Sequence, residues 1–460
     1  MKLKLFSFFF FSLVVSYTSL SYFTSNLDVL IKFETQKAPP ISSKKQKCDP
    51  DIAPFYIYEL PDRFNKALLS NCTKLDPWWN KCPYVENQGL GQPLYKKSIW
   101  YNTRSNWYNT YQFSADMIFH ARAVNHPCRT YNLSSALMFY IPFYPSLYAP
   151  SFFLETNFTR HDAMVVDLVD YISSFPNFQR HGGHDHFLVS GIMVHDLVRT
   201  PDKKDGKAFR SNNLLNLPKL LNVSILIIER KQLHKYKNHF GIPYPSYFHP
   251  RSKAEMISWQ NEVRRSKRTH LFSFVGGARQ KGHIAEMYRS SVINQCKRSK
   301  RCLLVFCKYW ASAWDAADEI LGAMKRARFC LQPPGDTATS RSVFDSILAG
   351  CIPVFFTDLM AYSQYEWYIP ENREDWSVFI RPEHLYRIED VLSGIPEKEV
   401  QRMREVVIGM IPQVTYVYPG ATRAEIGFRD AVDTALVELT KRVRHIKHGT
   451  DASSTLATFL

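Results

Sequence analysis

Short apolar runs recur along this 460-residue chain, and stretches with helical periodicity separate them. The runs lie at residues 55–61, 136–143, 186–191, 224–229, 270–277, 302–307, 329–333, 352–356 and 376–380. They are apolar on both faces and rich in β-branched and aromatic residues, as parallel strands buried between helices are. The alternation therefore predicts α/β layers built on parallel sheets.

These strands are too many for one small sheet, and prolines and charges interrupt the pattern near residues 244–256. We therefore predict an N-terminal domain over residues 51–250 and a C-terminal domain over residues 251–412. Apolar residues at helical spacing predict helices at 113–124, at 400–412 (ended by Pro412) and at 428–443. The last of these lies in a segment, 413–447, that is expected to pack back across the domains, and the tail 448–460 is expected to be disordered.

No charged side chain occurs from Leu5 to Phe23, after two lysines near the start. As a helix this stretch is about 28 Å long, enough to cross the apolar core of a bilayer. A cleaved signal peptide is the alternative, but no Ala-x-Ala-like cleavage site follows the stretch. We therefore predict a cytosolic tail at 1–4, a transmembrane signal anchor at 5–23, a stem at 24–50 and a lumenal body.

Glycosylation acceptors and cysteines fit a lumenal body. The acceptor asparagines are Asn71, Asn132, Asn157 and Asn222. The cysteine count of 9 is odd, so at least one cysteine is free or pairs with another chain. Cys296, Cys302 and Cys307 are close enough for a local disulfide, whereas Cys330 and Cys351 are interpreted as buried small hydrophobic residues.

The net charge of +16 would ordinarily suggest nucleic acid, which conflicts with the anchor and the glycosylation acceptors. We therefore expect no nucleic-acid partner. An anionic small ligand, an acidic polysaccharide or a membrane surface fits this charge better. Scattered solvated lysines and arginines are the simpler explanation for most of it.

One stretch, LQPPGDTATSRSVFDSILAGCIPVFF at residues 331–356, has the pattern of strand, loop, helix and strand. Thr339 or Ser340 can cap a helix over about residues 340–349, and Gly350 stands just past its end. In a doubly wound sheet such a loop lies at the carboxyl edge of the strands, where ligands bind.

The amino end of this helix suits a phosphate group, because it presents unpaired N–H groups and a partial positive charge. Arg341 in the first turn can bind a diphosphate, and Asp345 one turn later can accept hydrogen bonds from a ribose. The stretch has no Walker or Gly-x-Gly-x-x-Gly pattern, so an ordinary turn before a capped helix is the alternative. A second loop at 273–283 carries Arg279 and Lys281 after a strand, and two such basic loops indicate an anionic ligand.

The stretches around residues 273–283 and 331–356, together with YIYELPDRFN near the start, resemble the plant exostosin-like glycosyltransferases. The resemblance is greatest to the xyloglucan galactosyltransferase clade of that family. WYNTYQFSADMIFHARAVNHPCRT, FYIPFYPSLY, GGHDHFLVSG and FGIPYPSYFHP occur in the same order, so the resemblance covers roughly residues 52–440. It implies a GT-B fold of two Rossmann-like domains facing a cleft, in a single-pass type II Golgi membrane protein. It also implies a UDP-sugar donor such as UDP-galactose, a cell-wall polysaccharide acceptor such as xyloglucan, and transfer with inversion.

Carried over by position, the resemblance implies donor-binding residues in the C-terminal domain. Arg279 and Arg341 would contact the phosphates, and Ser340 and Ser342 would support them at the helix end. Asp345 matches the acidic position that would meet the ribose.

Direct displacement by the acceptor hydroxyl needs a base. Asp185 and His186 match the Asp-His-Phe stretch of the family, and we predict one of them as this base. The alternative is that their hydrogen bonds order the loop. A zinc site formed by His181, His184 and His186 is a further alternative, although this spacing matches no strong metal signature.

The chain has one Asp-x-Asp tripeptide, the pattern with which many glycosyltransferases hold Mn²⁺. It is Asp49-Pro50-Asp51, which lies at the stem rather than near the donor loops. We therefore predict an enzyme without metal or other cofactor, in which arginine and the helix dipole replace the cation.

The acceptor leaves fewer marks on the sequence. Aromatic residues that could stack on sugar rings gather in the N-terminal half, although most aromatics in a domain belong to its core. They are Trp78, Trp79, Trp100, Tyr101 and Trp107. The segment 191–200 departs from the clade pattern, so a pectic or other acidic acceptor, a UDP-uronic acid donor, and a catalytically weak glycan-binding scaffold stay open as alternatives.

Overall fold

The structure is a computed structural model that describes residues 47–94, 106–155, 157–199, 212–231, 237–283, 285–306 and 316–447. The predicted cytosolic tail, anchor and C-terminal tail lie outside these residues, as do most of the stem, Trp100, Tyr101 and Cys307. No helix among the described residues is long and apolar enough to cross a membrane.

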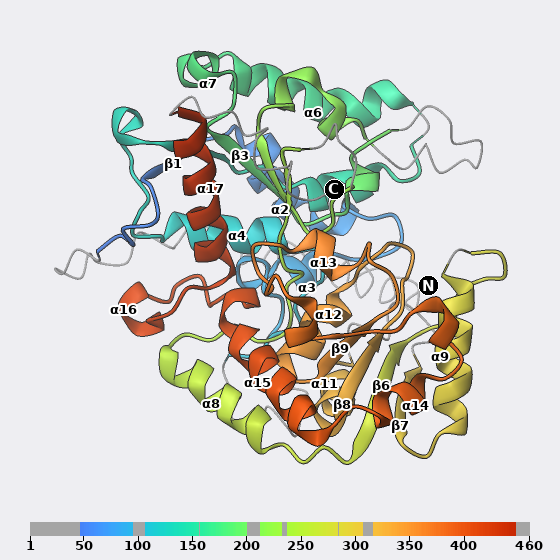
Figure 1. Ribbon diagram of the computed structural model, residues 1–460. Helices are drawn as coiled ribbons and strands as arrows, with labels where there is room; N and C mark the ends of the chain where they lie inside the picture. Colours follow the sequence, from blue (N-terminus) through green and yellow to red (C-terminus); the bar gives the residue numbers. More distant parts are fainter. Residues whose placement is uncertain are drawn as a thin grey trace, which may run out of the picture.

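Two five-stranded parallel sheets form the framework, one in each half of the chain (Figure 1). The first has the order β1 (Phe55–Ile57), β2 (Met138–Ile141), β3 (His186–Ser190), β4 (Ser224–Ile227), β5 (His239–Gly241). The second has the order β10 (Val378–Phe379), β9 (Ile352–Phe355), β8 (Ala327–Gln332), β6 (His270–Gly276), β7 (Cys302–Phe306). The predicted parallel α/β layers are therefore confirmed, and every predicted run overlaps a strand. The short β5 was not predicted, because it contributes only the apolar Phe240 between His239 and Gly241.

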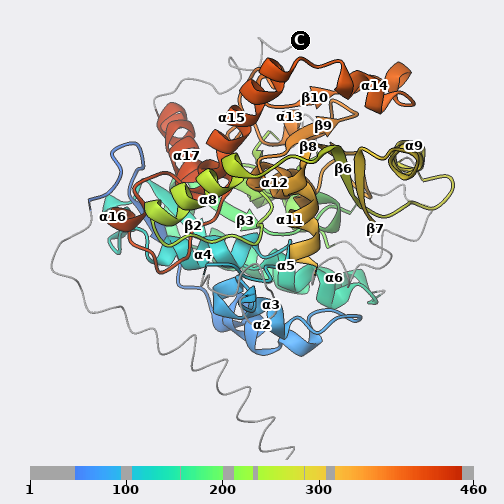
Figure 2. The same cartoon turned by 90° about the horizontal axis from the view of Figure 1, so that it is seen from below.

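Helices pack around both sheets (Figures 1 and 2). Those of the first half are α2 (Lys66–Ser70), α3 (Cys82–Val85), α4 (Ala115–Val124), α5 (Pro145–Tyr148), α6 (Phe158–Ser173) and α7 (Pro176–His181). Those of the second half are α8 (Lys253–Arg265), α9 (Glu286–Arg298), α11 (Ala317–Arg326), α12 (Arg341–Leu348), α13 (Ala361–Gln364), α14 (Ile388–Ser393), α15 (Glu397–Val414), α16 (Arg423–Ile426) and α17 (Ala431–Lys447). The domain boundary at 250 stays a prediction, with Gly241 ending the first sheet and His270 beginning the second.

Pro412 does not end its helix, contrary to the prediction, because α15 continues to Val414. A proline removes the N–H that would bond the carbonyl four residues earlier, here that of Ile408. The Gln260 side chain on α8 fills this place by donating its Nε2 to the Ile408 carbonyl at 2.9 Å. This side-chain contact thus satisfies the Ile408 carbonyl that Pro412 leaves unpaired, and the last turn of α15 can form.

The last helix, α17, returns to the N-terminal domain, as Figure 1 shows for the dark red helix beside β1 and β3. The Ala53 amide donates to the Thr440 hydroxyl at 2.9 Å. Arg442 donates to the Ser224 hydroxyl at 3.3 Å, at the start of β4. Because α15 packs in the C-terminal domain, the segment from α15 to α17 joins the two domains.

Disulfides link Cys48 to Cys128, Cys72 to Cys82, Cys296 to Cys302, and Cys330 to Cys351. The predicted local bridge is confirmed as Cys296–Cys302. The interpretation of Cys330 and Cys351 as unbonded hydrophobic residues is wrong, although both are buried. Cys330 lies opposite Pro353 in the β8–β9 register, which brings Cys351 within reach. This bridge closes the segment that contains the predicted donor loop and α12.

Candidate functional site

Two loops of the C-terminal domain leave the carboxyl edge of its sheet side by side. From β6 the chain first turns to β7 on one side and later adds β8 on the other side, so the strand order reverses between β6 and β8. Doubly wound sheets bind ligands outside the strand ends at such a point. The loops that leave it are residues 277–283 and 333–340, the two basic loops of the sequence analysis.

Arg279 joins these loops through a two-pronged ion pair with Asp336. The Nε–Oδ1 and NH2–Oδ2 distances are 2.8 and 3.1 Å. Arg289 on α9 donates to the carbonyls of Pro334 and Gly277, at 2.8 Å each, and so fixes both loops from behind. Because the Arg279 and Asp336 side chains are 20% and 45% exposed, an oxyanion such as a diphosphate can reach this guanidinium and replace the Asp336 carboxylate.

Helix α12 begins where the second loop ends. Ser340 is its N-cap residue, although the serine side chain makes no capping hydrogen bond. Gly350 lies beyond the end with φ of 59°, and a Cβ there would stand 2.3 Å from Val263. The predicted strand–loop–helix–strand unit is thus confirmed. Ser340 and Ser342 are half-buried, and neither hydroxyl hydrogen-bonds to another described residue, so their support of the phosphates stays a prediction.

Arg341 and Asp345 are buried at the domain interface, where Arg341 Nε donates to Asp345 Oδ2 at 3.2 Å. Arg341 also donates to the carbonyl of Thr110 in the N-terminal domain at 2.8 Å, and its guanidinium stacks 3.9 Å from the Tyr247 ring centre. Burial raises the pKa of Asp345, which the nearby Arg341 charge and the Ser246 hydroxyl oppose. These bonds support a role of both residues at the interface, and contacts of the pair with phosphate and ribose, which would have to replace them, stay a prediction.

Asp185 and His186 lie at the amino end of β3, where Asp185 lines a cavity of about 320 Å³ with His181, His184 and Lys447. The two basic loops lie beyond carboxyl strand ends, and β3 alone separates its two ends by about 13 Å, so a base at this pair stays a prediction apart from these loops. His186 Nδ1 stands 2.8 Å from Asp185, and its Nε2 stands 2.8 Å from the Tyr58 hydroxyl. Burial lowers the pKa of His186, which favours the neutral ring, and these hydrogen bonds are the kind that the alternative, an ordering role, describes. Parallel sheets bind ligands at the carboxyl ends of their strands. Residues that directly follow a strand reach this edge, whereas residues that directly precede it do not.

Glu229 is a candidate that the sequence analysis missed. It follows β4 at the carboxyl edge of the N-terminal sheet, and its side chain meets the donor loop of the other domain. The Ala338 amide donates to Glu229 Oε1 at 3.2 Å. Burial raises the pKa of Glu229 to about 7. The signal was present in SILIIE, because this acid stands directly after an apolar run.

The carboxylates of the acidic tripeptide near the stem form ion pairs with arginines. Asp49 pairs with Arg423 and Arg429, at 2.5 and 2.9 Å, and Asp51 pairs with Arg429. Across the described ranges, no group of three or more His, Cys, Asp or Glu side chains is arranged to hold a metal ion. The three histidines considered for zinc belong to these ranges.

The aromatic candidates divide into core and surface residues. Trp107 is fully buried and packs against Phe248 and Trp259, with ring centres 4.9 and 4.7 Å away. Trp78 and Trp79 are 49% and 36% exposed on a loop that the Cys72–Cys82 disulfide closes. Of the described candidates, Trp78 and Trp79 are therefore the ones whose rings solvent reaches, and their role in acceptor binding stays a prediction.

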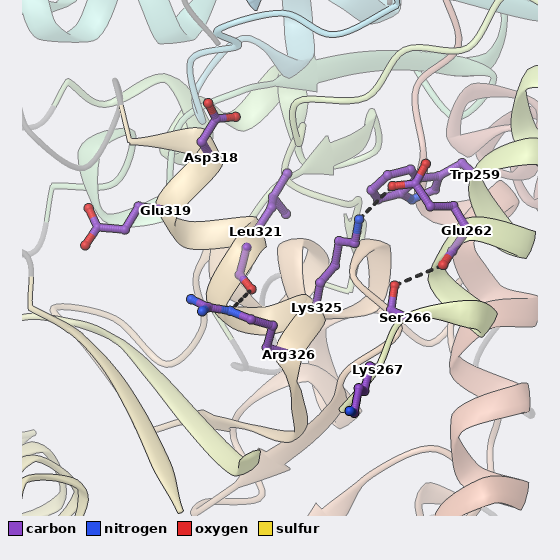
Figure 3. A pocket seen from close by; sticks show the side chains of 10 residues that line it. Trp259, Glu262, Ser266, Lys267, Asp318, Glu319, Leu321, Lys325 and Arg326 are labelled. Atoms are coloured by element: carbon purple, nitrogen blue, oxygen red, sulfur yellow. Dashed lines mark hydrogen bonds and ion pairs between the residues drawn. The ribbon is translucent and has the colours of Figure 1, made fainter. Parts of the chain in front are cut away.

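A cavity of about 570 Å³ lies between helices α8 and α11 (Figure 3). Lys325 crosses it, with an ion pair of 2.6 Å to Glu262 and its ammonium 5.0 Å from the Trp259 ring centre. Its lining comes from these two helices and the residues just after α8, and no loop at the carboxyl edge contributes. We therefore place the candidate site at the β6 and β8 loops.

Comparisons with known proteins identify the family of this chain. The family model described as "Exostosin GT47 domain" matches residues 53–395. "Probable xyloglucan galactosyltransferase GT17" of Arabidopsis thaliana is 46% identical over 403 residues, which are 88% of this chain and 85% of that protein. "Xyloglucan galactosyltransferase MUR3" of the same plant is 37% identical over 85% of this chain and 62% of its own length.

A third Arabidopsis thaliana relative has a different name. "Xyloglucan-specific galacturonosyltransferase 1" is 32% identical over 84% of this chain and 57% of its own length. Among solved structures, "Crystal structure of the pneumococcal O-GlcNAc transferase GtfA in complex with UDP and GlcNAc" overlaps with a TM-score of 0.26 and 10% identity, over 61% of this chain and 60% of that one. The family match and the long sequence relatives show that this chain belongs to the exostosin GT47 family.

Proposed function

We propose that this protein is an inverting glycosyltransferase of GT-B type that transfers galactose from UDP-galactose to xyloglucan side chains. The observation that carries the proposal is the 46% identity with a relative named as a probable xyloglucan galactosyltransferase, over nearly the whole body of both chains. The two parallel α/β sheets support the proposal, as does the pair of basic loops at a switch point, where such sheets bind ligands.

In the proposed reaction an acceptor hydroxyl oxygen attacks the anomeric carbon of the sugar. The new glycosidic bond forms as the bond to the diphosphate breaks, a base takes the hydroxyl proton, and UDP leaves with the electron pair. Arg279 and the amino end of α12 would stabilise the negative charge that grows on the leaving diphosphate.

The test is to incubate the purified protein with a panel of UDP-sugars and with xyloglucan and pectin fragments. We expect a galactosylated xyloglucan product from UDP-galactose. Transfer from UDP-galacturonic acid instead would support the second candidate, which the galacturonosyltransferase relative and the net charge of +16 favour. Neither transfer nor hydrolysis with any donor would contradict both and favour a glycan-binding scaffold.

We also propose that transfer needs no metal ion. Full activity is expected in excess EDTA, because Arg279 and the α12 amino end would carry the charge role of a cation. Activity that disappears in EDTA and returns with Mn²⁺ would contradict this.

Replacing Arg279 with alanine is expected to raise the Kd for UDP-galactose about 10- to 100-fold, from the loss of charge-assisted hydrogen bonds worth about 1.5–3 kcal/mol. Isothermal titration calorimetry measures this change. Asp336→Asn serves as the matched control, because it removes the partner of Arg279 but keeps the guanidinium. Equal weakening by both variants would point to a general disturbance of the loops instead.

Trp78→Ala is expected to raise KM for xyloglucan oligosaccharides roughly 3- to 10-fold, from the loss of one aromatic contact of about 0.5–1.5 kcal/mol. Donor hydrolysis without acceptor should not change. Tyr386→Ala, which removes a 69% exposed aromatic ring from the other domain, is the control. An unchanged KM in Trp78→Ala would exclude the indole from acceptor binding.

We further propose a single-pass type II protein of the Golgi membrane with a lumenal catalytic body. The acceptor asparagines Asn71, Asn132, Asn157 and Asn222 are all exposed, as glycan attachment requires. Endoglycosidase treatment of the protein made in plant cells should increase its mobility on a gel, and an unchanged mobility would count against a lumenal body.

A further inference from the structure

Glu229 connects the two domains at the loop that leads into α12. Its side chain is 6% exposed and comes from the end of β4. Oε1 accepts the Ala338 amide at 3.2 Å, and Oε2 accepts the Tyr244 hydroxyl at 3.3 Å. A carboxyl group of the N-terminal domain thus bonds to the backbone two residues before the N-cap of the helix in the C-terminal domain.

We propose that Glu229 is a positioning residue for the sugar nucleotide, holding the 337–339 loop so that the amino end of α12 faces the diphosphate. This inference rests on the proposed function, because it concerns the same donor site. Glu229 acts through the loop and belongs to the opposite domain, so donor binding depends on how the domains meet.

A second contact holds the same loop to the same strand end. The Tyr365 hydroxyl donates to the carbonyl of Ile228 at 2.8 Å and stands 3.5 Å from the Thr339 hydroxyl. Arg230, the next residue along, donates to the carbonyl of Ser363 at 2.6 and 3.0 Å. Residues 228–230 therefore form a continuous junction between the domains, and within it Glu229 is the residue that bonds to the loop backbone.

The charge of Glu229 changes near neutral pH, so its role in positioning the donor loop can be recognised by the pH dependence of donor binding. Burial raises its pKa to about 7, against the hydrogen bonds from Thr337, Ala338 and Tyr244. Below this pH the carboxyl is neutral, and its carbonyl oxygen can still accept the Ala338 amide. Above it a negative charge appears beside the site for an anionic diphosphate, so donor affinity should fall as pH rises.

Other titratable groups near Glu229 do not produce the same change. Burial raises the pKa values of the Tyr244 and Tyr365 hydroxyls well above 10.0, and the Glu229 charge adds to both shifts. Asp196 lies near Tyr244 on the segment after β3. The Arg230 side chain points to Ser363 and Glu366, and a Glu229 variant leaves both Asp196 and Arg230 in place. Asp345 on α12 is also a buried carboxyl with a raised pKa, and a Glu229 variant leaves it in place.

The experiment measures the Kd of UDP-galactose by calorimetry near pH 6 and pH 8, with the full chain and with Glu229→Gln and Glu229→Ala. UDP-galactose is chosen because its diphosphate diester keeps one charge state over this range. For the unchanged protein we expect Kd to rise about 3- to 10-fold towards pH 8. Glu229→Gln, which keeps an acceptor for the Ala338 amide, should bind at both pH values about as the unchanged protein does near pH 6. Glu229→Ala should weaken binding about 10-fold at both.

Glu366→Gln is the matched control, because this carboxylate pairs with Arg230 at the same junction but is 51% exposed. It should keep both the affinity and the pH profile. A pH profile in Glu229→Gln equal to that of the unchanged protein would overturn the inference, and the Gln variant decides this even where the Ala variant fails to fold. Failure of the unchanged protein to bind UDP-galactose or any other UDP-sugar would overturn the proposed function itself, and the inference with it.

Discussion

Replacing Arg341 with alanine is expected to lower the free energy of unfolding by about 3–5 kcal/mol, because it leaves the buried Asp345 carboxylate without its cation. The two side chains are 6% and 4% exposed, so solvent cannot compensate for the lost charge. The variant also loses the bond to the Thr110 carbonyl and the stacking on Tyr247. Because Thr110 belongs to the other domain, we expect the junction between the domains to loosen. Urea unfolding followed by tryptophan fluorescence measures the change.

Arg387→Ala provides the matched control, because Arg387 and Asp390 form a similar pair at the start of α14 whose side chains are 70% and 69% exposed. Its loss should cost less than about 1 kcal/mol. The double variant Arg341→Met with Asp345→Asn should recover part of the stability that Arg341→Ala loses, since no unpaired charge stays buried. Weaker UDP binding by Arg341→Ala with unchanged stability would contradict the interface assignment and restore the phosphate contact that the sequence predicted.

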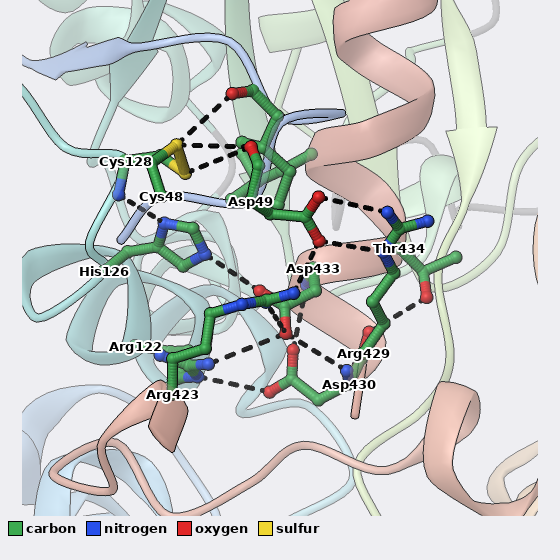
Figure 4. A network of polar contacts seen from close by, with 12 residues as sticks. Cys48, Asp49, Arg122, His126, Cys128, Arg423, Arg429, Asp430, Asp433 and Thr434 are labelled. Carbon is green, nitrogen blue, oxygen red and sulfur yellow. Dashed lines mark hydrogen bonds and ion pairs between the residues drawn. A yellow bond between two sulfur atoms is a disulfide. The ribbon is translucent and has the colours of Figure 1, made fainter. Parts of the chain in front are cut away.

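The second large effect concerns a buried ionic network that ties α17 to α4 (Figure 4). Asp433 on α17 lies 2.8 Å from His126, 3.2 Å from Arg423 and 3.7 Å from Arg122. Arg122 also pairs with Asp430 at 3.3 Å. We expect Asp433→Asn to lower the free energy of unfolding at neutral pH by about 3–5 kcal/mol, because the cationic partners lose their shared carboxylate.

This loss should depend on pH in a defined direction. Burial alone would raise the pKa of the Asp433 carboxyl. The His126 hydrogen bond and the charges of Arg122 and Arg423 outweigh burial and hold this pKa below the ordinary 3.8. The stabilisation is therefore complete above that value and disappears as pH falls through the lower pKa of the folded state. The unfolding free energies of Asp433→Asn and the unchanged protein should converge in acid.

Glu438→Gln on the same helix is the control, since Glu438 pairs with Lys441 whose side chain is 66% exposed. It should cost less than about 1 kcal/mol at every pH. A difference between Asp433→Asn and the unchanged protein that stays constant from neutral to acid pH would show that packing, rather than charge, accounts for the loss.

Local patterns in the sequence were enough to predict α12 and every strand described except β5. Buried parallel strands need apolar residues on both faces, and that requirement is visible in single segments. The end of α12 was predictable because Gly350 takes a left-handed conformation that other residues adopt at a cost. The positions of Arg279 and of the loop after β8 were predictable by the same logic, since both directly follow strands, whereas their contact with a donor stays a prediction.

The partners of individual side chains were not predictable, because they depend on contacts between distant segments. Arg341 meets a carbonyl 231 positions earlier in the chain, which no local pattern could indicate. The partner of Cys330 depends on which strands are neighbours in the sheet. Asp185 and His186 matched a family stretch, but only the direction of β3 showed that they lie at its amino end. Glu229 could have been found by applying to the N-terminal domain the rule that ligand-edge residues follow strands.

The central claim is that the diphosphate of the sugar nucleotide binds where the loops after β6 and β8 meet. A crystal structure of the protein with UDP tests this most directly. The account predicts that the diphosphate lies within hydrogen-bond distance of the Arg279 guanidinium and of backbone amides at the amino end of α12. UDP bound elsewhere, for example in the cavity between α8 and α11 or beside Asp185, would contradict it.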